Sequence, residues 1–370
     1  MRRDPKVSIV RCRGYDQAGV DGAIERAIEL LGGTESFLKR GDRVLLKPNL
    51  LSARLPEAGV DTHPAVVKAV VRLVKKAGAS PMVGDSPGGV VKAEEVYEKS
   101  GMKEAMDEEG VELVKFDQVE AKDGIPIASL ALDSDVVISI PKLKTHDLFP
   151  ITGAIKNIFG DVPGIFKSKC HLIYPTPKDF ARLLVNIFSW VSPKLSIMDA
   201  VWAMEGRGPG AGDLRNLGLI IGSSDAVALD AVVSCILGLN PFDLLTTREA
   251  HQRGLGQGDL SEIEIVGEEI DEVRVKDFRF PRIPIWHHVP SPFLRSVARF
   301  VKFWPVIDSA KCTGCKICLE SCPVGAIGLQ QERLVFDYKK CILCLCCHEF
   351  CPSGAISIER NLLGRVIGGF

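Results

Sequence analysis

The chain has 370 residues, a formal net charge of -1 at pH 7 and 46% hydrophobic residues. This composition is typical of a folded α/β protein rather than a disordered chain, and the near-neutral charge argues against a nucleic-acid binder that relies on overall basicity. The first residues lack the apolar core of a secretory signal, and no apolar stretch is long enough to cross a membrane. We therefore expect a cytoplasmic protein with one large or two modest domains besides its cysteine-rich end.

Short apolar runs alternate with segments of helical periodicity from Lys6 onward, which predicts β-α units around a mainly parallel sheet. The expected strands are residues 7–11, 44–47, 81–84, 111–116, 136–140, 195–198 and 217–221. The expected helices are residues 21–31, 64–77, 93–108, 152–158, 179–191 and 226–237. We assign residues 1–275 to this α/β domain.

Polar residues follow the ends of several expected strands, where open α/β sheets bind their ligands. The residues expected to act on an anionic substrate are Lys142, Lys144 and His146, with Asp85 or Asp199 handling protons. The residues expected to bind an anionic organic cofactor are Lys47, Asn49, Lys156, Asn157 and His171. Each of these could instead be an ordinary polar loop residue, but their grouping at one edge of the sheet favours a site.

Positive charge is densest between Lys142 and His171, where seven lysines and histidines oppose only Asp147 and Asp161. The same segment holds Thr152 and Gly153 at an expected helix start, whose backbone N–H groups attract anions. This pattern predicts binding of a phosphate or carboxylate group. The alternative is a solvated lysine face.

Two glycine-rich loops lie in the α/β domain. Gly84 and Gly89 have the outer spacing of a P-loop, but Val90 and Val91 occupy the positions that require lysine and serine or threonine, so the sequence does not predict a nucleotide-hydrolysing site. The second loop, residues 206–212, is expected to be either a loop over the site or a plain turn.

Five phrases carry a family resemblance: RVLLKPN at 43–49, GDSP at 84–87, PKLKTH at 141–146, GAIKN at 153–157 and SDAVALD at 224–230. Together they resemble the domain of unknown function 362 family over about residues 41–239. The resemblance implies an α/β architecture and a link to a carboxyl-terminal iron-sulfur module. It implies no particular substrate.

Residues 276–304 alternate arginines and lysine with aromatic residues and prolines. We expect an extended linker followed by a basic amphipathic helix at 292–304. Such a helix can lie on an anionic membrane or dock between two domains, and we favour docking.

Eight of the twelve cysteines form two copies of the pattern C-x-x-C-x-x-C-x-x-x-C-P, offset by 29 residues. The first copy contains Cys312, Cys315, Cys318 and Cys322, and the second contains Cys341, Cys344, Cys347 and Cys351. Three cysteines at this spacing on a tight loop can bind three corners of one iron-sulfur cubane, so the fourth ligand must come from elsewhere. We assign residues 305–361 to this domain and 362–370 to a tail.

The cysteine pattern closely resembles bacterial two-cluster ferredoxins, in which the cysteine before each proline ligates the other cluster. The resemblance implies one 4Fe-4S cluster on Cys312, Cys315, Cys318 and Cys351, and a second on Cys341, Cys344, Cys347 and Cys322. Structural zinc would leave the third and fourth cysteines of each copy and the prolines unexplained. A disulfide framework is not expected either, because a chain of 370 residues without a secretory signal is expected in a reducing compartment. Cys346 is expected to be an unligated neighbour, and Cys170 beside His171 has no defined coordination partners.

Two functions fit these features. In the first, the clusters exchange electrons between a redox partner protein and a site on the α/β domain that binds an anionic small molecule. In the second, the protein is a non-enzymatic carrier or assembly factor whose α/β domain recognises a partner protein.

Overall fold

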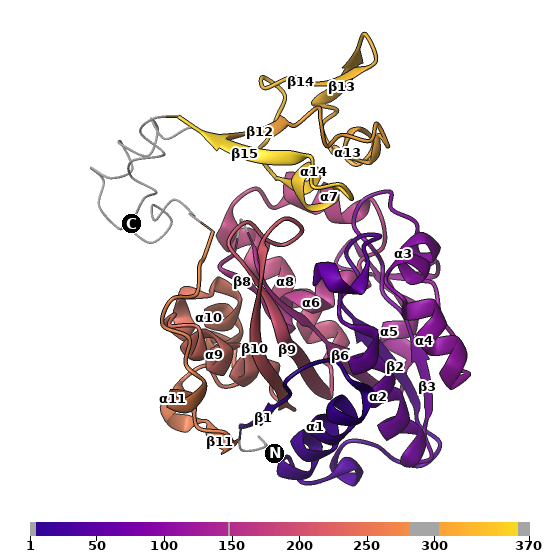
Figure 1. Cartoon of the computed structure of the whole chain (residues 1–370), viewed down its shortest axis with the longest axis vertical. Helices are drawn as coiled ribbons and strands as arrows, with labels where there is room; N and C mark the ends of the chain where they lie inside the picture. The colour runs from indigo at the N-terminus through magenta and orange to yellow at the C-terminus, as the bar shows by residue number, and fades with distance from the viewer. Residues whose placement is uncertain (1–4, 147–148, 282–302, 362–370) are drawn as a thin grey trace.

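The computed structural model describes residues 5–146, 149–281 and 303–361. Within these ranges, a nine-stranded sheet forms the centre of the larger body (Figure 1). Its strands are β1 (Lys6–Arg11), β2 (Arg43–Pro48), β3 (Ser80–Val83), β6 (Val136–Ile140), β7 (Lys142–Thr145), β8 (Ile151–Thr152), β9 (Leu195–Glu205), β10 (Asp213–Ser223) and β11 (Glu264–Gly267). A separate hairpin joins β4 (Val119–Lys122) to β5 (Ile125–Ala128).

The strand order is β11-β1-β10-β9-β6-β2-β3, and β7 pairs with both β8 and β9. The pairs that β2 makes with β3 and β6, and the pair of β6 with β9, are parallel. Strand β10 runs antiparallel to both β1 and β9. The prediction of a mainly parallel sheet is therefore confirmed, although the long strand β10 and the short strand β8 run antiparallel to their neighbours.

Helices cover both faces of the sheet. They are α1 (Gln17–Leu30), α2 (Pro64–Lys76), α3 (Ala93–Lys99), α4 (Met102–Glu109), α5 (Ser129–Asp133), α6 (Ala154–Asn157), α7 (Phe166–Ile173), α8 (Pro177–Val191), α9 (Ala226–Ile236), α10 (Leu245–Gln252) and α11 (Ile270–Val273). Helices α1, α2 and α4 pack on one face, and α8, α9 and α10 pack on the other (Figure 1).

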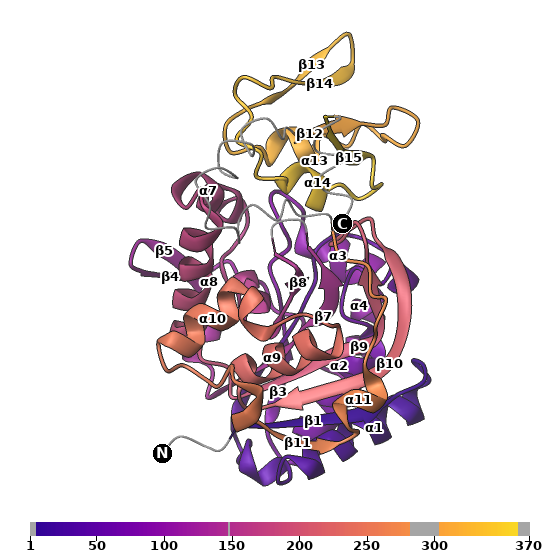
Figure 2. The same ribbon diagram turned by 90° about the vertical axis from the view of Figure 1, so that its left-hand side faces the viewer.

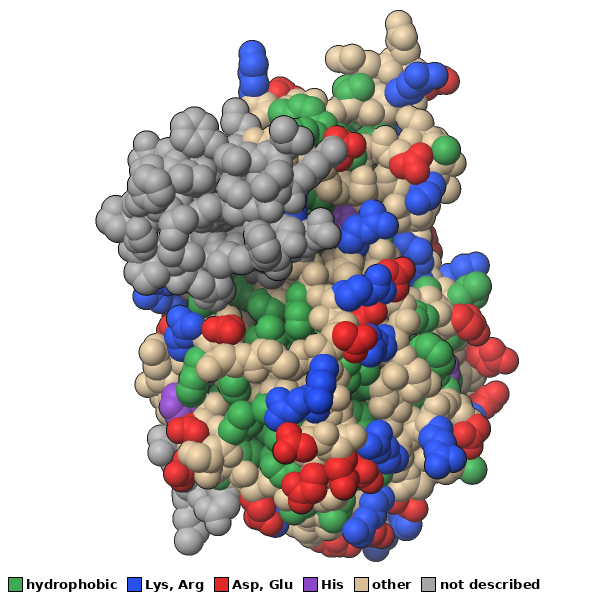
Figure 3. Space-filling model, turned by 60° about the vertical axis from the view of Figure 1, so that its left-hand side comes forward, with side chains coloured by type: hydrophobic (Ala, Val, Ile, Leu, Met, Phe, Trp, Pro, Cys, Tyr) green, Lys and Arg blue, Asp and Glu red, His purple; other side chains and the backbone are tan. Residues whose placement is uncertain are grey.

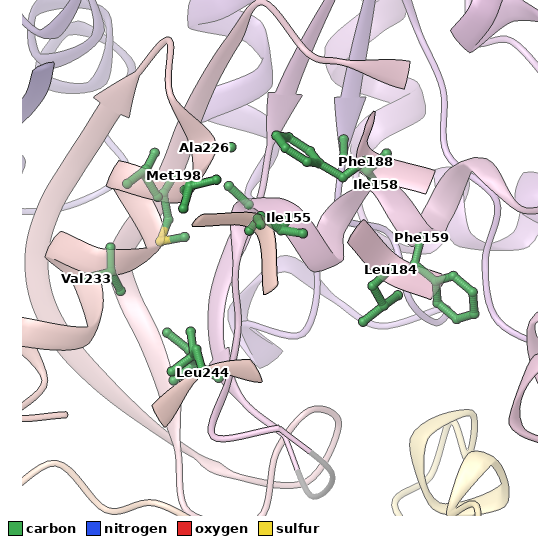
Figure 4. Close-up of a cluster of buried hydrophobic side chains, with 14 of the residues drawn as sticks. Ile155, Ile158, Phe159, Leu184, Phe188, Met198, Ala226, Val233 and Leu244 are labelled. Carbon is green, nitrogen blue, oxygen red and sulfur yellow. The ribbon is translucent and has the colours of Figure 1, made fainter. Parts of the chain in front are cut away.

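The two cores follow from the period of two in the strands. In β2, Leu45 faces the core that contains α8 and α9, whereas Val44 and Leu46 face the core that contains α1 and α2. Figure 4 shows part of the first of these cores, in which Ile155 of α6 lies between Met198 of β9 on one side and Leu184 and Phe188 of α8 on the other. Strands that are buried on both faces have continuous apolar sequences, as these strands do.

Residues 303–361, the cysteine-rich module, sit at one end of the α/β body (Figure 2). The module contains β12 (Phe303–Ile307), α13 (Ile317–Glu320), β13 (Ile327–Gln330), β14 (Arg333–Phe336), α14 (Cys346–Glu349) and β15 (Ile356–Arg360). Strands β12 and β15 pair antiparallel, as do β13 and β14. The predicted helix at 292–304 lies largely outside the described residues, but its last two residues begin β12, so that part of the prediction is wrong.

Three other element predictions need correction. Residues 111–116 form no strand. Their one pairing with the sheet is a single bridge between Leu113 and Val83, the last residue of β3. The helix expected at 93–108 is two helices, because Gly101 adopts a left-handed conformation with φ of 72° between them. The segment after Pro141 is not a loop but strand β7, which pairs with β9.

The helix expected at 152–158 begins at Ala154, and the two residues Ile151 and Thr152 form β8. Asp230 of α9 accepts hydrogen bonds from the backbone N–H groups of Ala154 and Ile155, at 2.6 and 3.2 Å. These are the donors that the sequence suggested for an external anion. A carboxyl group of the chain itself therefore occupies these donors.

None of the described helices is both long and apolar enough to span a lipid bilayer. On the face shown in Figure 3, basic and acidic side chains are interspersed over the α/β body. This mixed surface agrees with the net charge of -1.

His63 caps α2 and gives a pH-dependent prediction. Its Nδ1 accepts the backbone N–H of Ala65 at 3.2 Å, and burial lowers the pKa of His63 to about 4. Because the folded chain then binds fewer protons than the unfolded chain, stability present above pH 6.5 is lost as pH falls toward 4. His63→Asn keeps a capping acceptor that does not titrate. As pH falls from 6.5 to 4, the free energy of unfolding of the variant should rise by on the order of 2 kcal/mol relative to that of wild type, after allowing for the partial exposure of His63. If the two proteins lose stability equally over this pH range, the assignment is wrong.

Candidate functional site

Three of the lysines predicted for the site are fully buried: Lys47, Lys142 and Lys144 have exposed fractions of 0%, 1% and 1%. A solvated lysine face is therefore excluded for these three. Buried ammonium groups require partners, and the structure supplies a different partner for each.

Two of these lysines form ion pairs with aspartates that were also predicted for the site. Lys47 Nζ lies 2.8 Å from Asp85 Oδ1, and Lys142 Nζ lies 2.9 Å from Asp199 Oδ2. The Tyr15 hydroxyl donates to Asp199 and accepts from Lys142, at 2.8 and 2.6 Å. The carboxyl-terminal edge of the sheet thus holds two neutralised pairs.

The third lysine, Lys144, donates to the carbonyl oxygen of Val60 at 2.6 Å. Burial lowers its pKa, and burial raises the pKa of the nearby Asp61. Lys142, Lys144 and Asp199 lie beneath the surface of the site rather than against its cavity. Their predicted roles stay untested.

A cavity of about 70 Å³ lies where the α/β body meets the cysteine-rich module. Six of the predicted residues line it: Asn49, Asp85, His146, Lys156, Asn157 and His171. Glu349 and Phe350 of the module line its opposite side. We call this the junction cavity, which has room for a few water molecules or one small ion.

Several lining residues are fixed by their neighbours. Asn157 Nδ2 donates to Ser139 Oγ at 2.9 Å and to the carbonyl oxygen of Lys47 at 3.2 Å. The His171 ring stacks on Phe180 with 4.2 Å between ring centroids, and burial lowers the pKa of His171 to about 4. These contacts set the shape of the basic wall.

Glu349, which the sequence did not indicate, joins the two parts of the molecule. Its Oε1 lies 2.8 Å from His146 Nε2, and both side chains are buried. Burial alone would raise the pKa of Glu349, but the contact with His146 and the nearby Lys156 hold it below the usual range, although burial also lowers the pKa of His146. The module therefore inserts an ionised carboxylate into the basic wall of the junction cavity.

The first glycine-rich loop receives the module. A β-carbon at Gly88 would overlap the Phe350 ring, and one at Gly89 would overlap Ser321. Ser321 Oγ also accepts the backbone N–H of Val90 at 3.2 Å. Phe350 and Ser321 are equivalent positions in the two cysteine motifs, so both copies contact this loop, and the glycines serve protein docking rather than phosphate binding.

This contact predicts the effect of Gly88→Ala. Overpacking against Phe350 should destabilise the docked module by on the order of 1–3 kcal/mol. Thermal unfolding and limited proteolysis should detect the loss. Gly14→Ala is the matched control, because a β-carbon there meets nothing within 4 Å. If both variants unfold at the same temperature and are cleaved at the same rate, the close approach of Gly88 to Phe350 does not contribute to stability.

The second glycine-rich segment, residues 206–212, joins β9 to β10 and lies against the end of β7. The backbone N–H of Gly208 donates to Thr145 Oγ1 at 3.2 Å. Arg54 donates to the carbonyl oxygens of Gly210 and Cys351, at 3.4 and 3.1 Å. The turn therefore borders both the α/β body and the module.

The eight motif cysteines line two separate cavities in the module. Cys312, Cys315, Cys318 and Cys351 line one, and Cys322, Cys341, Cys344 and Cys347 line the other. Apolar side chains such as Ile307, Ile356, Ile327 and Phe336 complete their walls. This grouping is the one that the ferredoxin resemblance implies.

Local chemistry also fits iron-sulfur clusters. The cysteine before each proline accepts a backbone hydrogen bond on sulfur: Ala326 N–H to Cys322 Sγ and Ala355 N–H to Cys351 Sγ, both at 3.2 Å. Such bonds tune thiolate ligands. Cys346 is buried at the start of α14 and lines the second cavity beside Cys344 and Cys347.

Comparison with known proteins agrees with this architecture. Residues 44–234 match the family described as "Domain of unknown function (DUF362)". The chain belongs to the DUF362 family. Residues 311–355 match the 4Fe-4S dicluster domain, so this DUF362 protein carries a domain for two 4Fe-4S clusters.

One curated relative and one solved structure extend the comparison. A thylakoid-associated protein of Synechocystis is 35% identical over 311 residues, which cover 80% of this chain and 96% of the relative. The lactate racemase apoprotein of Thermoanaerobacterium thermosaccharolyticum is 13% identical with a TM-score of 0.38, covering 61% of this chain and 55% of the racemase. This chain thus spans about half the length of the racemase.

A larger open groove of about 860 Å³ lies at the amino-terminal ends of β6 and β9, and none of the predicted site residues line it. Sequence reasoning also missed Tyr15, Asp161 and Arg54. Asp161 is fully buried, and burial raises its pKa to about 7. The sequence signal for Asp161 was a charged residue within an apolar segment. That signal was not enough to place it in the site, because groups that act on it, such as Lys47 and Asp85, are distant in sequence.

Proposed function

We propose that this DUF362 protein is an iron-sulfur electron-transfer protein, in which the cysteine-rich module exchanges electrons with an anionic substrate or cofactor bound at the junction cavity. The observation that carries this proposal is the 2.8 Å contact between His146 and Glu349. It joins a predicted anion-binding residue to the helix that starts between Cys344 and Cys347. When bound, 4Fe-4S clusters supply one-electron transfer.

The protein's own residues would bind and orient the anion. Lys156 and His171 provide positive or donor groups on the wall of the cavity, and Asn49 adds a polar group. Asp161 follows the lining residue Gly160, and a carboxyl group with a pKa of about 7 can give or take a proton at neutral pH. Phe350 lines the cavity on the module side.

The proposal includes a redox partner protein and a cytoplasmic location. The thylakoid-associated relative supports an alternative at a membrane surface. Fractionation of cells that produce the tagged full-length protein distinguishes these locations.

Re-oxidation of the reduced protein tests the proposed activity. Anaerobic protein is reduced with dithionite, freed of reductant and mixed with a panel of carboxylates and organic phosphates that carry a reducible group, such as a carbonyl or a conjugated double bond, while its visible absorbance is followed. At least one anion should re-oxidise the protein, and Lys156→Ala should slow this by about tenfold or more, because one charge-assisted hydrogen bond to the anion is worth about 1.4 kcal/mol or more.

Lys169→Ala is the control, since Lys169 belongs to the same basic segment but is exposed on α7 and does not line the cavity. If no anion on the panel re-oxidises the wild-type protein, the carrier function becomes the better account. Equal slowing by both lysine variants would show a general charge effect and no site.

A further inference from the structure

The basic wall of the junction cavity already holds a carboxylate. Glu349 Oε1 is 2.8 Å from His146 Nε2, and Lys156 and His171 line the same cavity. The charge density of residues 142–171 predicted a phosphate or carboxylate ligand. In the docked molecule, that ligand group is supplied by the module.

The internal duplication places a glutamate at the same position in both cysteine motifs, but only one of the two is buried. Glu320 occupies the same position in the first motif, 29 residues earlier, and it is exposed at the end of α13. Glu349 is 7% exposed and faces the α/β body. Two equivalent glutamates therefore differ because one of them meets His146.

We propose that this basic wall is a binding site for small carboxylates, that Glu349 is its internal occupant, and that a carboxylate ligand binds by displacing Glu349. This inference rests on the proposed function and names its ligand class. Ligand binding and docking of the module then compete for the same contacts. The carboxylate is bound without any bond being made or broken.

The size of the site favours a ligand with few atoms. The junction cavity is about 70 Å³, and Phe159, Phe180 and Phe350 close parts of it. Removing the Glu349 side chain beyond its β-carbon frees the space of four heavy atoms, which is the number in acetate. A carboxylate with a short apolar or hydroxyl-bearing chain fits this space.

Chemical rescue tests the inference. Glu349→Ala is prepared with its clusters, kept oxidised, and titrated with sodium acetate, with sodium chloride and sodium sulfate at matched ionic strength as references. Acetate should raise the thermal midpoint of Glu349→Ala saturably and bind, by calorimetry, about tenfold or more tighter than to wild type, because the intramolecular competitor is gone. Glu320→Ala should behave like wild type.

Glu349→Gln provides a second variant if alanine prevents folding. Its neutral amide is a weaker occupant, so acetate should again bind more tightly than to wild type. The inference is overturned if neither variant gains saturable acetate binding, or if sulfate and chloride stabilise them as much as acetate does. Because the protein stays oxidised throughout, this result is independent of whether any anion re-oxidises the clusters.

Discussion

Replacing Cys322 by serine is expected to remove the cluster of the second cysteine motif and leave that of the first. Cys322 lines the same cavity as Cys341, Cys344 and Cys347, although it belongs to the first motif in sequence. A domain for two 4Fe-4S clusters holds about eight iron atoms, so the variant should retain about four. The size of the effect follows from the loss of one of four thiolate ligands.

Electron paramagnetic resonance of the reduced variants tests the crossing. Cys322→Ser and Cys341→Ser should give the same residual spectrum, and Cys351→Ser and Cys312→Ser should share a different one. Cys346→Ser, a substitution within the second motif, should keep about eight irons. A shared spectrum for Cys322→Ser and Cys312→Ser would show that each motif holds its own cluster.

Breaking the buried pair of Lys47 and Asp85 should have the largest effect on stability. Lys47→Met leaves the Asp85 carboxylate buried without its cation, although Asp85 Oδ2 still accepts the backbone N–H of Leu50 at 2.7 Å. Removing one partner of a buried ion pair costs on the order of 3–5 kcal/mol. Urea unfolding followed by circular dichroism should show this loss.

Two further variants test whether the loss of stability comes from the buried, unpaired carboxylate. Lys47→Met with Asp85→Leu should recover much of the lost stability, since apolar replacement of both partners removes the uncompensated charge. Lys76→Ala, which breaks an exposed contact with Glu25, should leave the midpoint unchanged. If Lys47→Met is as stable as Lys76→Ala, the buried pair carries no structural weight.

The sequence predicted the central sheet well because both faces of its strands are buried. Residues 136–140 were predicted as a strand with the bounds of β6, and the apolar run of β2 was correct to within one residue at each end. Strand β7 was missed because its two lysines and its threonine made a buried strand look like a polar loop. Their partners, such as Asp199 and Val60, are far away in sequence.

The same distinction explains the candidate site. Strand ends can be located from the sequence, and Asn49, Asp85 and His146, which follow strands, line the junction cavity. The other three predicted residues that line it lie on α6 and α7. Which lysine faces a cavity and which pairs with an aspartate depends on packing between distant segments. Glu349 was not indicated because a glutamate in a cysteine motif is ordinary, and its equivalent Glu320 is indeed exposed. Gly88 and Gly89 likewise matched a phosphate-loop spacing, whereas their contacts are with Phe350 and Ser321.

A redox titration of Glu349→Ala tests most directly whether anion binding in the junction cavity changes the reduction potential of the clusters. Removing a negative charge beside the second cysteine motif should raise the midpoint potential of at least one cluster, and saturating acetate should lower it again, since binding and reduction are reciprocally linked. Glu320→Ala should show no acetate-dependent shift. A midpoint potential in Glu349→Ala that acetate leaves unchanged, although acetate binds, would contradict coupling between the anion site and the clusters.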